Sequence, residues 1–259
     1  MTSAKRARDD SAHIRPKKMP DMIADRIRQM IARGQIGDGE WLPTEPELME
    51  RFGVSRPTLR EAFRLLEADS LITIRRGPPG GARVTIPGPE AAAAQFSLLL
   101  TLSKTTLQDV YEARMVIEPS CARQLAERGS ATNRRALIDE VEHVRAALET
   151  PVEFGRRTVQ FHRRLVELSG NRTLATVIGM LTEVMQRQTA RTYDETHGKP
   201  DDLEANNRRA LRAYERLSEL VQDRDGVGAE EFWLKHMKVA RSYFLRNKAD
   251  STQIVDLLY

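Results

Sequence analysis

The sequence predicts a mainly α-helical protein of two parts: a small N-terminal unit with three helices and a β-hairpin, and a larger C-terminal antiparallel all-α bundle. Two observations predict the first part. Apolar residues recur at helical spacing up to residue 69, and two short β-branched runs then flank a Gly- and Pro-rich segment. A third observation predicts the bundle, because no convincing strand follows the breaker sequence at residues 87–89.

Composition and charge narrow the class of protein. Apolar residues make up 40% of the chain and charged residues 30%, which suits a protein with packed cores and a polar surface. The net charge of +4 lies entirely within residues 1–89 and has the sign that nucleic-acid phosphates require, although ordinary surfaces carry similar charge. The single cysteine, Cys121, cannot form an intramolecular disulfide, and the apolar run at residues 91–102 is too short to span a bilayer. We therefore expect a cytoplasmic protein with no membrane partner.

The elements of the N-terminal unit are predicted from apolar spacing and capping residues. Residues 20–33 show helical periodicity, and Thr44 with Glu47 three residues later forms a capping box that begins a second helix. Ser55 begins a third helix, which we expect to end near residue 69. Two strands, joined by a Gly-rich tip, are expected at residues 71–74 and 83–86.

The third helix has two different faces. One is an apolar stripe that can dock on the body of the unit: Leu59, Ala62, Phe63 and Leu66. Another carries Arg56, Arg60 and Arg64 at four-residue spacing. Two helices joined by a tight turn and followed by a two-stranded wing form a winged helix-turn-helix, whose second helix enters the major groove of DNA. The alternative is that the arginines form an ordinary solvated helix face.

Three segments of this unit also resemble a known family. Residues 42–48 (LPTEPEL), 52–62 (FGVSRPTLREA) and 65–72 (LLEADSLI) resemble, in this order, the signature of GntR-type transcription regulators. The resemblance implies a winged helix-turn-helix that binds double-stranded operator DNA. It also implies that Ser55, Arg56, Thr58 and Arg60 contact DNA from the recognition helix, with Arg64 as a further candidate.

The wing and the second helix complete the implied DNA-binding set. By the same resemblance, Arg76 and Gly77 would contact DNA from the wing, where glycine lets the backbone approach the duplex. The chain departs from the family at Pro46, where the family usually has an arginine that contacts DNA. We therefore expect the operator of this protein to differ from the common one.

The C-terminal part resembles the helical effector domain of the FadR subfamily. The resemblance rests on residues 107–118 (LQDVYEARMVIE) and on Phe161-His162 followed by residues 168–171 (LSGN). It implies a bundle that binds a small-molecule effector, such as a carboxylate or acyl metabolite, and that forms a homodimer. Helices are expected at residues 90–102, 107–128, 132–149, 151–169, 171–192, 201–222 and 229–247.

The domain assignment follows from both resemblances and from the breaker sequence at residues 87–89, which marks the boundary. We assign residues 1–19 to a basic flexible tail, 20–86 to the winged helix-turn-helix, 87–94 to a linker, 95–248 to the effector-binding and dimerisation domain and 249–259 to a C-terminal tail.

Many members of the subfamily hold a divalent metal in the bundle with one Asp and three His. In this sequence His162 matches the first histidine and His236 the last, whereas Thr158 stands at the Asp position and Asn207 at the second histidine. Hydroxyl and amide groups are poor substitutes for the missing carboxylate and imidazole. We therefore expect no metal cofactor, with His162 and His236 as the residues that would bind a metal if one were present.

These four positions, together with Arg114, are expected to contact the effector directly: Arg114, Thr158, His162, Asn207 and His236. For Arg114 the alternative is an intrahelical ion pair with Glu118 at i+4. For the two histidines the alternative is a core position in which hydrogen bonds satisfy the ring.

The sequence therefore predicts a ligand-responsive transcription repressor that binds a palindromic operator as a homodimer. We expect no enzyme activity, since no phosphate loop, nucleophile elbow or HExxH motif is present. The alternative is a helical metabolite-binding protein or enzyme whose winged-helix domain serves protein contacts.

Overall fold

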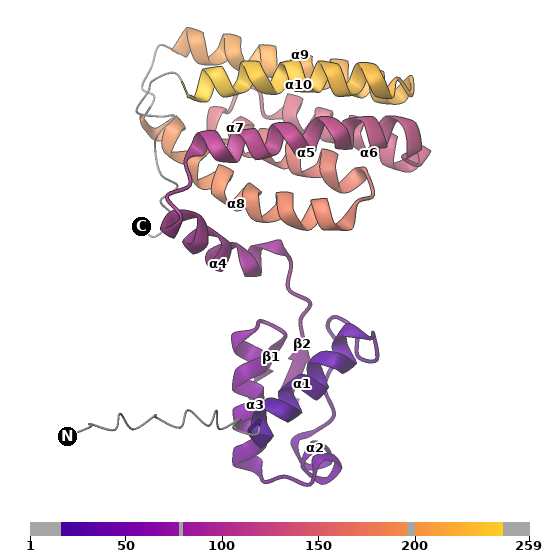
Figure 1. The fold of residues 1–259 in the computed structure, drawn as a ribbon, viewed down its shortest axis with the longest axis vertical. Helices are drawn as coiled ribbons and strands as arrows, with labels where there is room; N and C mark the ends of the chain where they lie inside the picture. The colour runs from indigo at the N-terminus through magenta and orange to yellow at the C-terminus, as the bar shows by residue number, and fades with distance from the viewer. Residues whose placement is uncertain (1–16, 78–79, 196–199, 246–259) are drawn as a thin grey trace, which may run out of the picture. The chain divides into compact units, whose positions relative to one another are not determined.

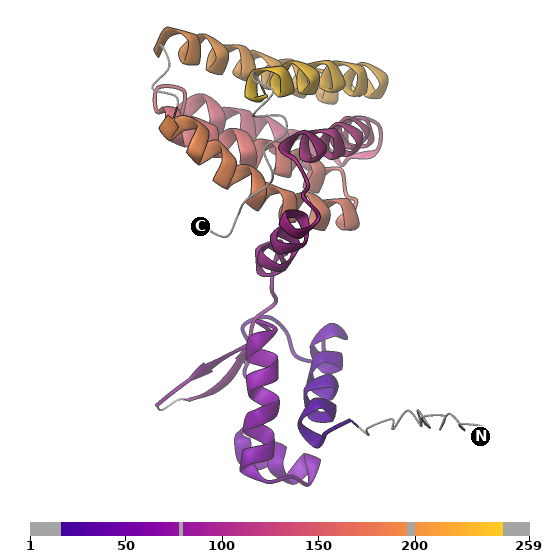
Figure 2. The ribbon, with the colours of Figure 1, turned by 60° about the vertical axis from the view of Figure 1, so that its left-hand side comes forward.

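The computed structural model describes residues 17–77, 80–195 and 200–245. The chain divides into two compact units, Met1–Pro87 and Gly88–Tyr259, and each is described by itself (Figures 1 and 2). The predicted C-terminal tail at residues 249–259 lies outside the described residues, as does the predicted N-terminal tail up to residue 16.

The first unit packs its helices and one hairpin around an apolar core. The elements are α1 (Met19–Ala32), α2 (Glu45–Phe52), α3 (Arg56–Ala68), β1 (Ile72–Arg75) and β2 (Gly81–Val84). The predicted capping box is confirmed, because the Thr44 hydroxyl accepts from the backbone of Glu47 while the Glu47 carboxylate accepts from the backbone of Thr44. Gly53 then ends α2 in the left-handed conformation, at φ +64°, which lets the chain turn tightly into α3.

The hairpin is confirmed, but its second strand lies two residues earlier than predicted. β1 and β2 are antiparallel, and Ile72 pairs with Val84. This register buries Ala82 and Val84 against the core, so the strand that was expected at residues 83–86 occupies Gly81–Val84. Ile86 lies beyond the pairing and is 57% exposed. Sequence periodicity alone did not show that β2 ends at Val84, because the limits of a strand depend on its pairing with the partner strand.

In the part of the second unit that the structure describes, seven helices occur near the predicted positions. They are α4 (Pro89–Leu102), α5 (Leu107–Arg128), α6 (Ala131–Ala146), α7 (Pro151–Leu168), α8 (Arg172–Glu195), α9 (Pro200–Gln222) and α10 (Gly226–Phe244). α10 begins three residues earlier than predicted, because the Asp225 side chain caps it by accepting from the backbone of Gly228. The segment between the units is shorter than the expected linker at residues 87–94, because Pro89 already occupies the first turn of α4.

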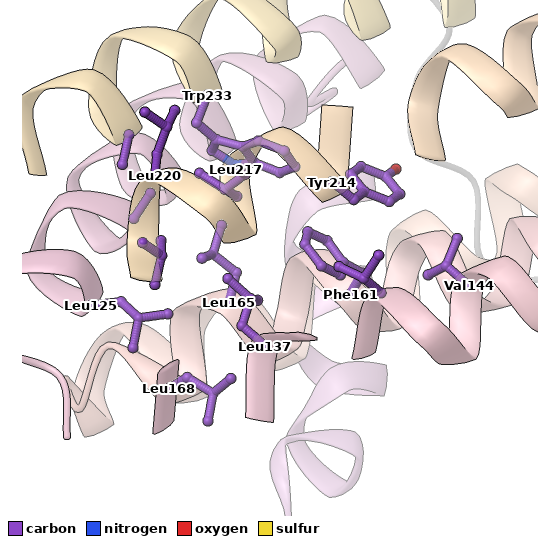
Figure 3. Close-up of a cluster of buried hydrophobic side chains, with 14 of the residues drawn as sticks. Leu125, Leu137, Val144, Phe161, Leu165, Leu168, Tyr214, Leu217, Leu220 and Trp233 are labelled. Carbon is purple, nitrogen blue, oxygen red and sulfur yellow. The ribbon is translucent and has the colours of Figure 1, made fainter. Parts of the chain in front are cut away.

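The core of the second unit combines a group of aromatic side chains with many aliphatic ones. Phe161 stacks on Tyr214 with ring centroids 4.3 Å apart, and Trp233 lies 5.9 Å from Phe161 (Figure 3). These residues come from α7, α9 and α10, so the cluster joins helices that are distant in the sequence. Among the described residues, no helix is both long and apolar enough to cross a bilayer.

Candidate functional site

The first candidate site is the exposed face of α3. The predicted apolar stripe is confirmed, with exposed fractions of 0–4% at Leu59, Ala62, Phe63 and Leu66. The cationic face is open, since the side chains of Arg56, Arg60 and Arg64 are 58%, 63% and 76% exposed. Burial on one side therefore holds the arginines outward on the other.

A groove in the first unit brings most of the predicted DNA contacts together. Arg56, Arg60 and Arg64 line it from α3, and Arg76 and Gly77 line it from the tip of the hairpin. Gly77 has φ +89°, a conformation that favours glycine. Ser55 and Thr58 are not among the lining residues, and their hydroxyls contact each other at 3.0 Å.

Sequence reasoning missed two residues of this groove. Arg75 lies beside Arg76 and adds a further positive charge. Glu45, the first residue of α2, forms ion pairs with two residues of the recognition helix: its Oε2 lies 3.2 Å from Arg56 Nε, and its Oε1 lies 3.5 Å from Arg60 Nε. Pro46 also lines the groove, at the position where the resemblance implies an arginine. Arginines outnumber glutamates among the residues that line the groove, and this positive charge suits the phosphates of a nucleic acid.

The second candidate site is a cavity in the helical bundle. It contains about 740 Å³ of space, including the part open to solvent. The predicted effector residues all line it, from four helices: Arg114 on α5, Thr158 and His162 on α7, Asn207 on α9 and His236 on α10. Most of the remaining wall is apolar and includes Phe154, Val159, Met185 and Met237. A mainly apolar cavity with a few convergent polar groups is typical of a small-molecule site.

A fully buried carboxylate, Glu118, organises the polar side of the cavity. Its Oε1 accepts from Arg114 Nε at 2.7 Å. Its Oε2 lies 2.5 Å from His162 Nδ1 and accepts from Trp233 Nε1 at 3.0 Å. The i+4 ion pair that sequence analysis gave as the alternative for Arg114 is therefore present, and Arg114 also lines the cavity. Sequence analysis gave Glu118 no role beyond this pair.

The protonation states follow from burial and from these contacts. Burial alone raises the pKa of Glu118, but the Arg114 charge and the hydrogen bonds from His162 and Trp233 outweigh it and lower that pKa to about 2. Burial and the nearby Arg114 charge together lower the pKa of His162 by more than Glu118 raises it. Near neutral pH the His162 ring is therefore neutral, and its Nδ1–H donates to Glu118. Burial and the nearby His162 lower the pKa of His236 to about 3.

Two polar atoms on the cavity side are buried without a hydrogen-bond partner among the described residues. They are the Thr158 hydroxyl and His236 Nε2. The His236 ring stacks on Trp233, with centroids 4.6 Å apart, and this contact holds the ring in place. A buried polar atom without a partner is costly, so a bound molecule with a polar group here would gain from pairing with it.

Arg209 is a further lining residue that sequence analysis missed. Its side chain is exposed and forms no ion pair with the described residues, unlike Arg114. Among the described residues that line the cavity, Arg209 on α9 is therefore an arginine whose charge no ion pair balances.

The residues present do not fit the divalent metal that the subfamily resemblance implies. Beside His162 and His236, the other two positions offer only a hydroxyl and an amide, Thr158 and Asn207. Glu118, the nearby carboxylate, has both oxygens engaged by Arg114, His162 and Trp233. Among the described residues, no three His, Cys, Asp or Glu side chains gather as a metal-binding group.

Together, the fold and its two sites define a DNA-binding transcription regulator that carries a helical ligand-binding domain. Residues 20–84 match the family described as "Bacterial regulatory proteins, gntR family", and residues 109–239 match the FCD domain. The chain belongs to the GntR family of bacterial regulatory proteins, in the branch whose C-terminal domain is FCD.

Curated relatives and solved structures agree with this assignment. The chain is 28% identical to the HTH-type transcriptional repressor NanR of Klebsiella aerogenes over 226 residues, which is 86% of this chain and 84% of the relative. It is 34% identical to NanR of Shigella sonnei over 161 residues, 60% of this chain and 59% of the relative. The Streptococcus agalactiae GntR structure covers 86% of this chain and 99% of its own, at 21% identity and a TM-score of 0.66, which supports the fold. The NanR relatives are named as transcriptional repressors and not as enzymes.

We predict that Glu118→Gln destabilises the protein by about 3–5 kcal/mol at pH 7, because it leaves the buried Arg114 charge uncompensated. The folded pKa of Glu118 lies below its ordinary value, so its contribution is complete above about pH 4.5 and is lost as the pH falls towards about 2. Urea unfolding at a series of pH values should show the gap between wild type and variant closing over that window.

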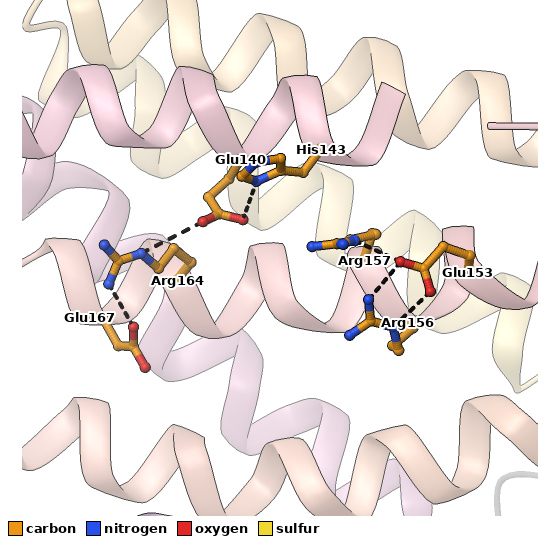
Figure 4. Close-up of polar contacts among 7 residues, drawn as sticks. All are labelled: Glu140, His143, Glu153, Arg156, Arg157, Arg164 and Glu167. Atoms are coloured by element: carbon orange, nitrogen blue, oxygen red, sulfur yellow. Dashed lines mark hydrogen bonds and ion pairs between the residues drawn. The ribbon is translucent and has the colours of Figure 1, made fainter. Parts of the chain in front are cut away.

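The matched control for this prediction is Glu153→Gln. Contacts with Arg156 and Arg157 (Figure 4) also lower the pKa of Glu153 to about 2, but the Glu153 side chain is 36% exposed, whereas Glu118 is fully buried. Solvent screens such pairs, so the loss should be clearly smaller. Equal losses in the two variants would contradict the role given to burial at Glu118.

We also predict that the purified protein binds no divalent transition metal in the cavity. Elemental analysis should find far less than one equivalent of zinc, nickel or manganese, and adding these ions should leave the melting temperature unchanged. More than about half an equivalent that disappears in His162→Ala would overturn the argument from ligand chemistry.

Proposed function

We propose that the protein is a ligand-responsive transcription repressor that binds a palindromic operator as a homodimer and releases it when a small molecule fills the bundle cavity. The observation that carries the DNA-binding half is the groove where Arg56, Arg60 and Arg64 meet the wing. Arginine pairs bidentately with guanine edges and also binds phosphate. A DNA-binding regulator of a bacterial family acts where the chromosome lies, in the cytoplasm.

The homodimer follows from the geometry of operator binding. One recognition helix reads a few base pairs, so two copies related by two-fold symmetry bind half-sites one helical turn apart. Leu99 and Leu102 on α4 are 62% and 70% exposed in the single chain. An interface between two copies that covers these leucines would remove apolar surface from water.

The effector is proposed to bind the cavity without a metal. Arg114 is already balanced by Glu118, so a carboxylate effector would direct its charge to Arg209 at the wall of the cavity. Its other polar groups would pair with Thr158 Oγ1 and His236 Nε2, and its apolar part would contact Phe154 and Met237. This arrangement suits a carboxylate or acyl metabolite that carries a hydroxyl or carbonyl group.

Effector binding and DNA binding are thermodynamically linked. An effector that releases DNA must bind the free protein more tightly than the DNA-bound protein, and by the same factor DNA must weaken effector binding. The repressor role rests on the NanR relatives, which are named as repressors.

We predict that Arg56→Ala or Arg60→Ala weakens operator binding by about 1–3 kcal/mol for each lost base contact. The operator is first selected by the wild-type protein from a pool of random duplexes, and gel shifts then compare the variants at one salt concentration. The control is Arg145→Ala, an exposed arginine of α6 that pairs with Glu142 and Glu215. Unchanged affinity in both Arg56→Ala and Arg60→Ala would contradict the proposal that this face of α3 binds the operator.

We predict that a short hydroxy- or keto-carboxylate which raises the melting temperature of the wild type loses at least about tenfold in affinity with Thr158→Val or His236→Ala. Each change removes a buried group that the ligand would pair with. The control is Thr176→Val, an exposed threonine of α8. A ligand that binds both cavity variants as tightly as the wild type does not occupy this cavity.

A further inference from the structure

We propose that Glu45 positions Arg56 and Arg60 for base recognition and thereby sets the sequence specificity of DNA binding. This inference rests on the proposed role of the two arginines in operator binding. It concerns a third residue, which lies on a different helix and contacts both of them.

The geometry places one carboxylate against two arginines. Arg56 and Arg60 are one turn apart on α3, and the two oxygens of Glu45 are shared between them: Oε2 lies 3.2 Å from Arg56 Nε, and Oε1 lies 3.5 Å from Arg60 Nε. In each pair the closest contact is made by Nε, at the root of the guanidinium group. The terminal Nη groups, which can form a bidentate contact with guanine, are not the atoms that make these two contacts.

Glu45 is itself held in place. It is the first residue of α2, where the helix dipole favours a negative charge. The neighbouring acid, Glu47, is engaged in the capping box with Thr44, so Glu45 is not needed to cap the helix. The Glu45 side chain is 27% exposed, against 58% and 63% for the two arginines, and it is therefore the more fixed partner.

The negative charge of Glu45 has opposite effects on non-specific and on specific DNA binding. Non-specific binding depends on phosphate neutralisation, and a carboxylate in the groove opposes it. Specific binding needs both guanidinium groups in one orientation, and a bridging carboxylate restricts their rotamers before DNA arrives. Glu45 therefore weakens binding to unrelated DNA and favours the duplexes that match the orientation it imposes. Lower affinity for wrong partners is a recognised source of specificity.

Arg64 shows the contrast within the same groove. Its partner is Glu61, on its own helix at i−3, and the two side chains are 76% and 50% exposed. This pair connects nothing to α2 and cannot orient α3 side chains against the rest of the unit. Glu61→Gln is therefore the matched control: it removes one exposed carboxylate from the same helix without breaking an interhelical contact.

The test compares Glu45→Gln, Glu45→Asp and Glu61→Gln with the wild type. Each protein selects duplexes from the same random pool, and gel shifts then measure affinity for the wild-type consensus duplex and for an unrelated duplex at several salt concentrations. Glu45→Gln is expected to lower the ratio of the two affinities by about tenfold, partly through tighter binding to the unrelated duplex. Glu61→Gln should leave that ratio within about twofold of the wild type, as exposed pairs contribute little.

The Asp variant separates position from charge. Glu45→Asp keeps the negative charge but shortens the reach to the arginines, so affinity for the unrelated duplex should stay near the wild-type value while the selected sequences become more varied. The base pairs that lose preference should be those that Arg56→Ala or Arg60→Ala also affects. Unchanged melting temperatures will show that the variants are folded.

Two outcomes would overturn the inference. One is a wild-type affinity ratio and wild-type sequence preference in Glu45→Gln. The other is an equal fall in affinity for both duplexes, which indicates a structural role. If Arg56→Ala and Arg60→Ala change the selected sequences but Glu45→Gln does not, only the role of Glu45 fails. If none of the three changes them, the proposed function of the helix face fails as well.

Discussion

The DNA-binding half of the protein depends on the burial of one side of α3. Leu59, Ala62, Phe63 and Leu66 are 4% exposed or less, and burying a large apolar side chain contributes about 1.5–3 kcal/mol. Because the helix packs on the unit through this stripe, the arginines on its other face are exposed to solvent. The groove between α3 and the wing is a consequence of that anchor, and so is the interhelical contact of Glu45.

The ligand-binding half depends on a different kind of interaction. Glu118 is fully buried and accepts from groups on α5, α7 and α10, so one carboxylate connects three helices around the cavity. Such a network is stable only when every member is satisfied, and it leaves little freedom to the side chains it holds. Among the described residues that line the cavity, Thr158 Oγ1 and His236 Nε2 are buried without a hydrogen-bond partner. A mainly apolar wall with a few polar atoms is typical of a small-molecule site.

Periodicity and capping chemistry were enough to predict the helices, the capping box and the two faces of α3, because these depend on residues within a few positions of each other. The resemblance to known regulators predicted residues that the structure gathers at one cavity. The role of Glu118 could not be predicted beyond its contact with Arg114. His162 and Trp233 lie 44 and 115 positions away, and only tertiary packing brings them to the carboxylate. Glu45 was missed for the same reason, since its partners are on the next helix. The start of α10 and the ends of β2 were misplaced because local composition does not define where an element begins or ends.

Methylation interference on the selected operator tests the central claim most directly. Methyl groups at guanine N7 lie in the major groove, where an arginine of α3 would pair, whereas methyl groups at adenine N3 lie in the minor groove. We expect guanine methylation to block binding at two clusters separated by about 10 base pairs, one for each recognition helix of a dimer. Interference at adenine N3 alone, with no effect of any guanine N7 methyl group, would contradict the claim that the cationic face of α3 reads the major groove.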